Sequence, residues 1–185
     1  PASINAALRP NRVAIPVEAV PIPADSAPLI LFVGTLNYPP NEEAVQWLVQ
    51  SVLPCLRRHL AGAWRLRVLG RSPGAGLRRA LDEAGVELVA DAAQLAPHYA
   101  EARVAVVPVF TGGGSKVKLL EALSHGRPVV ATRHGVRGLA EPARALIPQA
   151  DDADRFALEI ARFCRDAALA GRIGANGRAM MLSGT

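Results

Sequence analysis

Residues 104–132 read VAVVPVFTGGGSKVKLLEALSHGRPVVAT, and this stretch contains one complete unit of a parallel β-sheet. The apolar run at 104–109 is typical of a strand buried on both faces. The leucines within 116–125 recur at helical spacing, and Gly126 follows as a C-terminal cap. A second apolar run at 128–132 indicates another strand. The stretch therefore predicts two parallel strands joined by a helix.

The same alternation of apolar runs and amphipathic segments continues over most of the chain. It predicts an α/β fold with a Rossmann-like parallel sheet and helices on both faces. Pro54 lies inside one helical segment and is expected to kink or split it. Strands are expected at 29–33, 64–69, 86–89, 104–109 and 128–132, with a further one at 144–147. Helices are expected at 42–60, 76–84, 93–101, 116–125, 151–168 and 171–180.

The first 28 residues differ from the rest of the chain. Residues 1–28 contain six prolines and no sustained periodicity. This pattern indicates a linker or an extended arm, with a short strand at 13–15. We therefore expect one domain at 29–180, followed by a tail at 181–185. The chain begins with proline and without methionine, which suggests a fragment of a longer protein.

Composition limits the possible functions. The 185 residues, half of them hydrophobic, suit one domain with a proper core. The arginines are scattered and only 4% of the residues are aromatic, which disfavours a nucleic-acid-binding surface. The net charge of +5 has two readings. It reflects either a compositional preference for arginine or a weak attraction for phosphates or an anionic membrane surface.

The two cysteines suggest the cellular compartment. Cys55 and Cys164 fall in separate helical segments without metal-ligand spacing, so neither a disulfide framework nor a metal site is expected. A reducing cytoplasm fits this pattern best. No apolar run approaches the roughly 18 residues needed to span a bilayer, and no secretory leader opens the chain.

Loops that follow the predicted strands are rich in glycine. In an open parallel sheet, ligands bind at the carboxyl ends of the strands, near the point where the strand order reverses. We therefore expect the functional site at this edge of the sheet. The loops that meet there are Gly34-Thr35, Gly70-Arg71, Ala90-Asp91, 110–115 and 133–135.

Three consecutive glycines precede the helix at 116–125. Gly112, Gly113 and Gly114 would let the backbone approach a phosphate, because no Cβ stands in the way. A helix amino terminus attracts anions, and Lys116 and Lys118 add positive charge there. The alternative is a flexible turn with two solvated lysines. The dinucleotide fingerprint and the Walker A pattern are both absent, which disfavours ordinary NAD and ATP sites.

Glu121 also has two interpretations. It lies close to Lys118 on the helical wheel, so an exposed i, i+3 ion pair is one of them. The other is a carboxylate that accepts hydrogen bonds from ribose hydroxyls, as acidic residues do in dinucleotide-binding folds. Spacing alone favours the ion pair.

Three segments together resemble a known family. They are VGTLNYPPN at 33–41, ADAAQLAPHYAEARVAVVPV at 90–109, and GGGSKVKLLEALSHGRPVVAT at 112–132. The chain is similar over about 29–178 to the C-terminal domain of GT-B glycosyltransferases. The closest group is family GT4, the glycosyl transferases group 1. LLEALSHGRPVVAT is the most specific part of the resemblance.

The resemblance implies that 29–180 binds a nucleoside diphosphate sugar and that no metal takes part. Glu121 matches the second glutamate of the family signature and would contact the ribose hydroxyls. The first signature glutamate falls at Gly113, where this sequence departs from the family. Lys118 and Lys116 are the candidates for the diphosphate, but no catalytic residue is identified. The implied donor-binding residues are Gly34, Thr35, Gly112, Gly113, Gly114, Ser115, Lys116, Lys118, Leu119 and Glu121.

The implied reaction is a retaining hexosyl transfer in the synthesis of cell-surface polysaccharide. It would take place in the cytoplasm, at the inner face of the membrane. The acceptor would be held by an N-terminal domain that is missing here, so the isolated chain is expected to be inactive. A nucleotide-sugar epimerase of the same fold and a non-catalytic nucleotide-binding or scaffold domain are the alternatives. His98, His125 and His134 are interpreted as water-exposed residues without a catalytic role.

Overall fold

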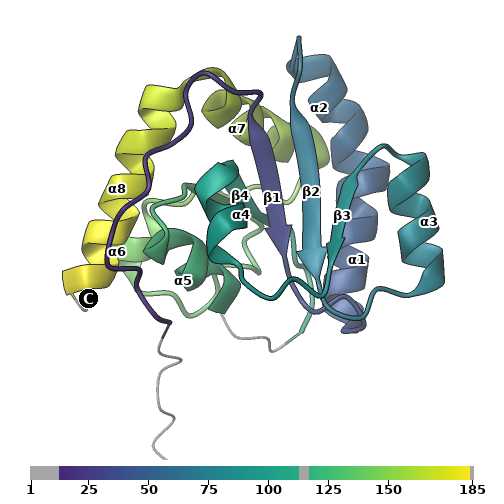
Figure 1. Cartoon of the computed structure of the whole chain (residues 1–185), viewed down its shortest axis with the longest axis horizontal. Helices are drawn as coiled ribbons and strands as arrows, with labels where there is room; N and C mark the ends of the chain where they lie inside the picture. The colour runs from purple at the N-terminus through teal and green to yellow at the C-terminus, as the bar shows by residue number, and fades with distance from the viewer. Residues whose placement is uncertain (1–12, 113–116, 184–185) are drawn as a thin grey trace, which may run out of the picture.

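A computed structural model describes residues 13–112 and 117–183, and its centre is a five-stranded parallel sheet in the order β3-β2-β1-β4-β5 (Figure 1). The predicted α/β fold with a Rossmann-like parallel sheet is confirmed. The strands are β1 (Leu29–Val33), β2 (Arg65–Gly70), β3 (Glu87–Ala90), β4 (Ala102–Val107) and β5 (Val129–Ala131). The helices are α1 (Pro39–Trp47), the π-helix η1 (Leu48–Val52), α2 (Leu53–His59), α3 (Ala75–Glu83), α4 (Ala96–Glu101), α5 (Val117–Ser124), α6 (Glu141–Arg144), α7 (Ala153–Arg165) and α8 (Ala167–Ser183).

Both faces of the sheet are covered because β1 and β4 are apolar at nearly every position. Alternate residues of β1 point to opposite faces, so Ile30 and Phe32 pack on one side and Leu31 on the other. Side chains of η1, α2 and α7 cover the first face. Leu119 of α5 and Tyr99 of α4 cover the second. The helices of these two layers cover the faces of the sheet and leave the strand ends uncovered. Polar groups gather at these strand ends.

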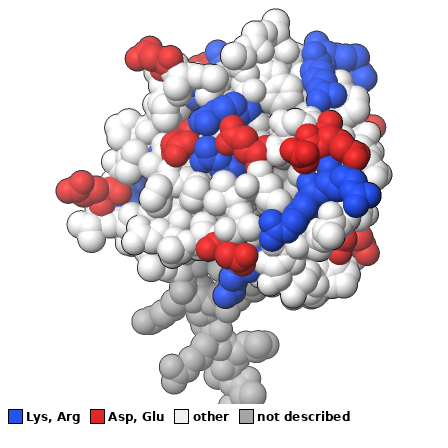
Figure 2. All heavy atoms as spheres, turned by 45° about the vertical axis from the view of Figure 1, so that its right-hand side comes forward, with Lys and Arg blue, Asp and Glu red and all other residues white. Residues whose placement is uncertain are grey.

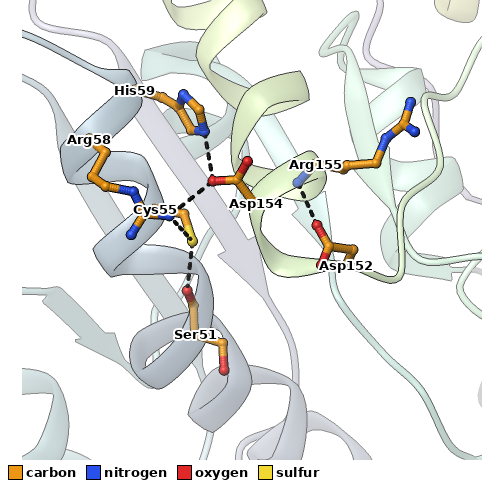
Figure 3. Close-up of polar contacts among 7 residues, drawn as sticks. All are labelled: Ser51, Cys55, Arg58, His59, Asp152, Asp154 and Arg155. Atoms are coloured by element: carbon orange, nitrogen blue, oxygen red, sulfur yellow. Dashed lines mark hydrogen bonds and ion pairs between the residues drawn. The ribbon is translucent and has the colours of Figure 1, made fainter.

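Pro54 lies at the start of α2, and the π-helix η1 immediately before it separates α1 from α2. The expected split of the first long helix is thus a π segment between two α-helices. Proline has no N–H to bond the carbonyl four residues earlier, and a π segment accommodates such a gap. Beside it, the thiol of Cys55 donates to the carbonyl of Ser51 at 3.3 Å (Figure 3).

Polar side chains cap the start of α7 and fix it against α2 (Figure 3). Asp152 caps the amino terminus of α7 by accepting a 2.9 Å hydrogen bond from the backbone N–H of Arg155. Asp154 pairs with Arg58 at 3.0 Å and with His59 at 2.9 Å, and these contacts lower the pKa of its carboxyl group. These residues are exposed or partly exposed, so the pairs contribute modestly to stability.

Residues 13–28 form neither a helix nor a strand, so the short strand expected at 13–15 is absent. This arm runs along α8 and then crosses to the start of β1 (Figure 1). Backbone carbonyls of the arm accept hydrogen bonds from three buried arginines, which are Arg103, Arg127 and Arg178.

The strand expected at 144–147 is wrong. Pro142 begins the short helix α6, because a proline in the first turn supplies helical φ without losing an intrahelical bond. The N–H of Ala145 then bonds to the carbonyl of Glu141 at 2.9 Å, which places the segment in a turn. Pairing with the sheet is limited to one bridge between Gln149 and Ala131.

Basic and acidic side chains lie beside one another on the face seen in Figure 2, and no broad area of one sign forms there. The largest network in the described part of the chain joins the amino ends of β2 and β3 to α4. In it, Arg65 and Arg67 each pair with both Glu87 and Glu101. Such a surface lacks the single-sign field that attracts a polyanion.

Candidate functional site

A cleft of about 1130 Å³ lies at the carboxyl ends of the strands. The sheet order reverses between β1 and β4, and the loops after these two strands form opposite sides of the cleft. The cleft therefore occupies the position where sheets of this kind bind ligands. The residues that line it include Gly34, Thr35, Asn41, Arg71, Gly112, Lys118, Leu119, Glu121, His134 and Arg137.

Glycines let the loops approach closely at the floor of the cleft. A Cβ on Gly70 would overlap the carbonyl oxygen of Gly34, so no larger residue fits between β1 and β2 at this point. A Cβ on Gly135 would lie 2.9 Å from the carbonyl oxygen of Val107. The loops after β1, β2 and β5 are thus drawn together around the same space.

Lys118 lies in the first turn of α5, and its side chain reaches into the cleft. Its ammonium donates a hydrogen bond to the side-chain oxygen of Asn41 and lies 5.3 Å from the centre of the Phe32 ring. Among the described residues, no carboxylate lies within ion-pair distance of it. Burial lowers the pKa of Lys118 to about 8. The cleft thus contains a partly desolvated cation whose charge no acid neutralises.

Glu121 lies one turn further along α5 and has a different partner from the one that spacing favoured. Its carboxylate accepts a 3.3 Å hydrogen bond from the hydroxyl of Tyr99. The i, i+3 ion pair with Lys118 is therefore wrong, because the two side chains bond to different elements. Burial raises the pKa of the Glu121 carboxyl, and the hydrogen bond from Tyr99 opposes this rise. The ring of His125 stacks on that of Tyr99, with the two ring centres 4.6 Å apart.

The loop after β4 enters the cleft through Gly112, which has a φ of 91°. A Cβ there would lie 2.9 Å from both the Tyr38 hydroxyl and a ring carbon of Pro40, so the position requires glycine on two grounds. The carbonyl of Gly112 lies 2.9 Å from Nε2 of His134, in the loop after β5. These contacts fix Gly112 at the edge of the cleft.

Six of the ten predicted donor-binding residues line this one cleft. They are Gly34, Thr35, Gly112, Lys118, Leu119 and Glu121. Gly113, Gly114, Ser115 and Lys116 lie outside the described residues. The role of all ten in binding a donor stays a prediction.

The histidines are not simply exposed, which corrects their interpretation. His98 lies 3.2 Å from a guanidinium nitrogen of Arg67, and burial lowers its pKa. His125 stacks on Tyr99, and burial lowers its pKa as well. His134 bonds to the glycine loop of the cleft. Each is partly buried, and each has a partner that comes from a distant part of the chain.

Sequence reasoning missed Asn41 and Tyr99. Asn41 belongs to the VGTLNYPPN segment, but nothing in its spacing indicates that it will meet Lys118. Tyr99 was one residue of a predicted amphipathic helix. Its scarcity was the available signal, since the chain contains two tyrosines.

Among the described residues, no group of three or more His, Cys, Asp or Glu side chains could hold a metal ion. None of the described helices combines the length and the apolar character required to cross a membrane.

The fold and cleft agree with the comparisons to known proteins. A model of the family "Glycosyl transferases group 1" matches residues 27–166, and the chain belongs to this family. Among curated proteins, none matches the sequence significantly.

Solved structures show the same fold at low sequence identity. The C-terminal domain of the group 1 glycosyl transferase LpcC from Francisella tularensis has a TM-score of 0.64 at 15% identity, covering 89% of this chain and 95% of that one. TarM from S. aureus, solved with UDP, has a TM-score of 0.72 at 14% identity, covering 94% and 35%. HepE from Anabaena, solved with UDP and glucose, has a TM-score of 0.60 at 15% identity, covering 85% and 44%. The chain thus matches a C-terminal domain almost completely, but spans about a third of TarM and less than half of HepE.

Proposed function

From this family membership and the geometry of the cleft, we propose that the chain is the donor-binding domain of a retaining glycosyltransferase. It would bind a nucleoside diphosphate sugar, and the parent protein would transfer the sugar, a hexose, to an acceptor. The observation that carries the proposal is the Lys118 ammonium, held without a carboxylate partner at the switch point of the sheet. A cation in this state favours the binding of an anion.

The other charges of the cleft support a diphosphate. Arg71 and Arg137 also line it, and Glu121 is the one carboxylate among its described lining residues. When the sugar leaves, negative charge increases on the diphosphate. A positioned ammonium in a partly water-excluded site stabilises that charge more than water does. Lys118 would therefore stabilise the leaving group, so that no bound metal is required.

Glu121 is suited to orient the ribose. One carboxylate oxygen accepts from Tyr99, and because Glu121 lines the cleft, the other would accept from a ligand. Ribose hydroxyls donate hydrogen bonds in pairs, and a carboxylate is the acceptor with enough lone pairs for both. With Lys118 one turn earlier on α5, the same helix would contact the diphosphate and the ribose of one nucleotide. Because Gly113 has no carboxylate, contacts to the transferred sugar would have to come from other groups.

The parent protein would supply the acceptor site through an N-terminal domain, so this chain alone would be inactive. We place the enzyme in the cytoplasm, at the inner face of the membrane, in the synthesis of a cell-surface polysaccharide. UDP in the TarM and HepE structures supports a nucleotide donor in this fold.

Titration with UDP, GDP, ADP and their sugars tests the proposal. We expect one nucleoside diphosphate to bind, and Lys118→Met to weaken it by about 1–3 kcal/mol through loss of a charged hydrogen bond. Arg79→Ala is the matched control, because Arg79 is an exposed cation on α3 outside the cleft.

If the chain binds no nucleotide, the scaffold alternative is favoured. If Lys118→Met binds as the parent does, the diphosphate lies elsewhere. Product analysis of the full-length protein separates transfer from epimerisation, since the first gives a glycosylated acceptor and the second an epimerised donor sugar.

A further inference from the structure

Asn41 is a polar side chain buried at the edge of the cleft, with 6% of its surface exposed. Its amide group donates to the carbonyl of Thr35 at 2.9 Å and accepts from the ammonium of Lys118. A carbonyl can only accept and an ammonium can only donate, so these partners fix which end of the amide faces each of them. Asn41 is therefore locked in one orientation, with its oxygen toward Lys118.

The glycines of the cleft floor make this orientation possible. Asn41 is near the start of α1, and its amide lies directly over the end of β1. A Cβ on Gly34 would lie 3.0 Å from the amide nitrogen of Asn41 and would push it away. Gly70 has no Cβ either, which lets β2 approach Gly34 from the other side. Gly34 thus leaves the space in which Asn41 can bond to Thr35, and Gly70 lets β2 lie close to Gly34.

An uncharged partner has a different effect on an ammonium from a charged one. A carboxylate would hold Lys118 equally well, but it would neutralise the charge that an anionic ligand needs. An amide oxygen fixes the ammonium through a dipole and leaves its net charge in place. We propose that Asn41 is the positioning residue that holds Lys118 toward the donor diphosphate while keeping its charge available, an inference that rests on the proposed function.

The surroundings of Lys118 are consistent with this role. Phe32, the other neighbour of the ammonium, is uncharged as well. Burial without a compensating charge gives Lys118 its lowered pKa of about 8. The other titratable side chains that line the described cleft are Tyr38, Arg71, Glu121, His134 and Arg137.

Calorimetry with UDP, inorganic pyrophosphate and uridine tests the inference on the intact chain. We expect Asn41→Ala to weaken UDP and pyrophosphate about fivefold, and Asn41→Asp to weaken both at least about tenfold, because Asp would pair with Lys118. Uridine has no phosphate, so its affinity is expected to change less than twofold. In a Lys118→Met background, we expect Asn41→Ala to have no further effect, since it acts through the ammonium.

Asn37→Asp is the matched control for added negative charge. Asn37 also lines the cleft, but its side chain has no hydrogen bond to Lys118. We expect its effect on pyrophosphate to be less than a third of that of Asn41→Asp. Equal effects would show general repulsion and overturn the inference.

The lysine content of the chain offers an independent readout. Lys116 and Lys118 are its two lysines, so ¹³C-labelled lysine gives two side-chain signals by NMR, and Lys118→Met assigns them. We expect Asn41→Asp to raise the measured pKa of Lys118 by at least about one unit. The absence of such a rise would show that the side chain at position 41 does not contact the ammonium, and it would overturn the inference.

The outcomes separate the two proposals. If the parent binds neither UDP nor pyrophosphate, the proposed function fails. A second outcome is that the parent binds UDP and pyrophosphate and Lys118→Met binds neither, but Asn41→Asp binds pyrophosphate as tightly as the parent. This result would overturn the role of Asn41 and leave the proposed function in place. If Asn41→Ala weakens uridine as much as UDP, it acts on the fold of the cleft, which also overturns the role.

Discussion

The two edges of the sheet both contain buried or partly buried cations, but the cations are satisfied very differently. At the amino edge, Arg127 is fully buried and donates to the carbonyls of Ala102 and His125 as well as to the arm. At the carboxyl edge, Lys118 has one hydrogen bond within the described part of the chain, to the amide of Asn41. Positively charged side chains thus lie at both ends of the same strands, but they differ in how fully hydrogen bonds satisfy their N–H groups.

The arginines at the amino edge hold chain segments together. Arg103 joins the arm to the end of α7 through Cys164, and Arg178 joins it to the end of α5 through Ser124. A guanidinium has five N–H donors in a planar fork, which suits several carbonyls at once. Hydrogen bonds therefore compensate the burial of these cations at every buried side-chain nitrogen except Nε of Arg103, which has no partner among the described residues, and their role is structural.

Lys118 shows the opposite balance. An under-satisfied cation destabilises a fold, and a protein keeps it where a ligand restores the missing interactions. A structural cation therefore differs from a functional one in how many of its N–H groups have hydrogen-bond partners, and not in burial alone.

Removing a structural arginine is expected to have the largest effect. Arg127→Ala leaves several buried carbonyls without a donor and releases the arm, so we expect unfolding to become easier by about 3 kcal/mol or more. Chemical denaturation measures this change, with the exposed Arg79→Ala as a control within about 0.5 kcal/mol. If Arg127→Ala does not fold, Arg127→Lys keeps the charge and is expected to lose about half as much. A loss below about 1 kcal/mol in both variants would contradict the structural role of this edge.

The contact of Glu121 with ribose is expected to have the next largest effect. If Glu121 binds two hydroxyls, Glu121→Ala leaves them without partners and weakens the nucleotide by roughly 1.5–3 kcal/mol. A 2′,3′-dideoxy nucleotide is expected to bind the parent weakly and to respond little to the mutation. Calorimetry on this cycle gives the coupling energy, and thermal melts check the fold. If the two losses of binding free energy are additive, Glu121 does not contact the ribose and is not part of the site. The carboxyl edge would then differ less from the amino edge.

The pH dependence of binding is expected to be the smallest effect. The protonated form of Lys118 binds the diphosphate, so affinity is present below its pKa of about 8 and is lost as the pH rises through that value. Between pH 7 and pH 9 we expect the dissociation constant of UDP to rise about tenfold, or about 1.4 kcal/mol. Terminal phosphates titrate near pH 6, below this window. A profile as steep in Lys118→Met as in the parent would assign the titration to another group.

The fold could be predicted because it depends on local patterns. Each strand that is buried on both faces reads as an apolar run, and each loop at the carboxyl edge contains the turn residues that it needs. Gly34, Gly112 and Lys118 could be placed at one edge for the same reason, since the carboxyl ends of parallel strands always meet there. Local signals failed at 144–147, where an apolar run lay beside a proline that begins a helix.

The hydrogen-bond partners of the site residues could not be predicted. Asn41 and Lys118 lie 77 residues apart, and Tyr99 and Glu121 lie 22 apart. Spacing favoured a Lys118–Glu121 pair, because it sees only neighbours on one helix. Packing against α1 and α4 offered each side chain a better-placed partner and overrode that local preference.

The sequence by itself therefore determined the α/β fold, its family and the edge at which a ligand would bind, because these follow from periodicity and from glycines at strand ends. The tertiary structure alone decided which cations are satisfied. A lysine ammonium or an arginine guanidinium can contact backbone carbonyls, a side-chain amide or open space. Which of these it contacts depends on side chains and backbone that the fold brings together from distant segments. Arg127 and Lys118 are both cations next to apolar runs in the sequence, and only the fold gives one a structural role and leaves the other available to a ligand.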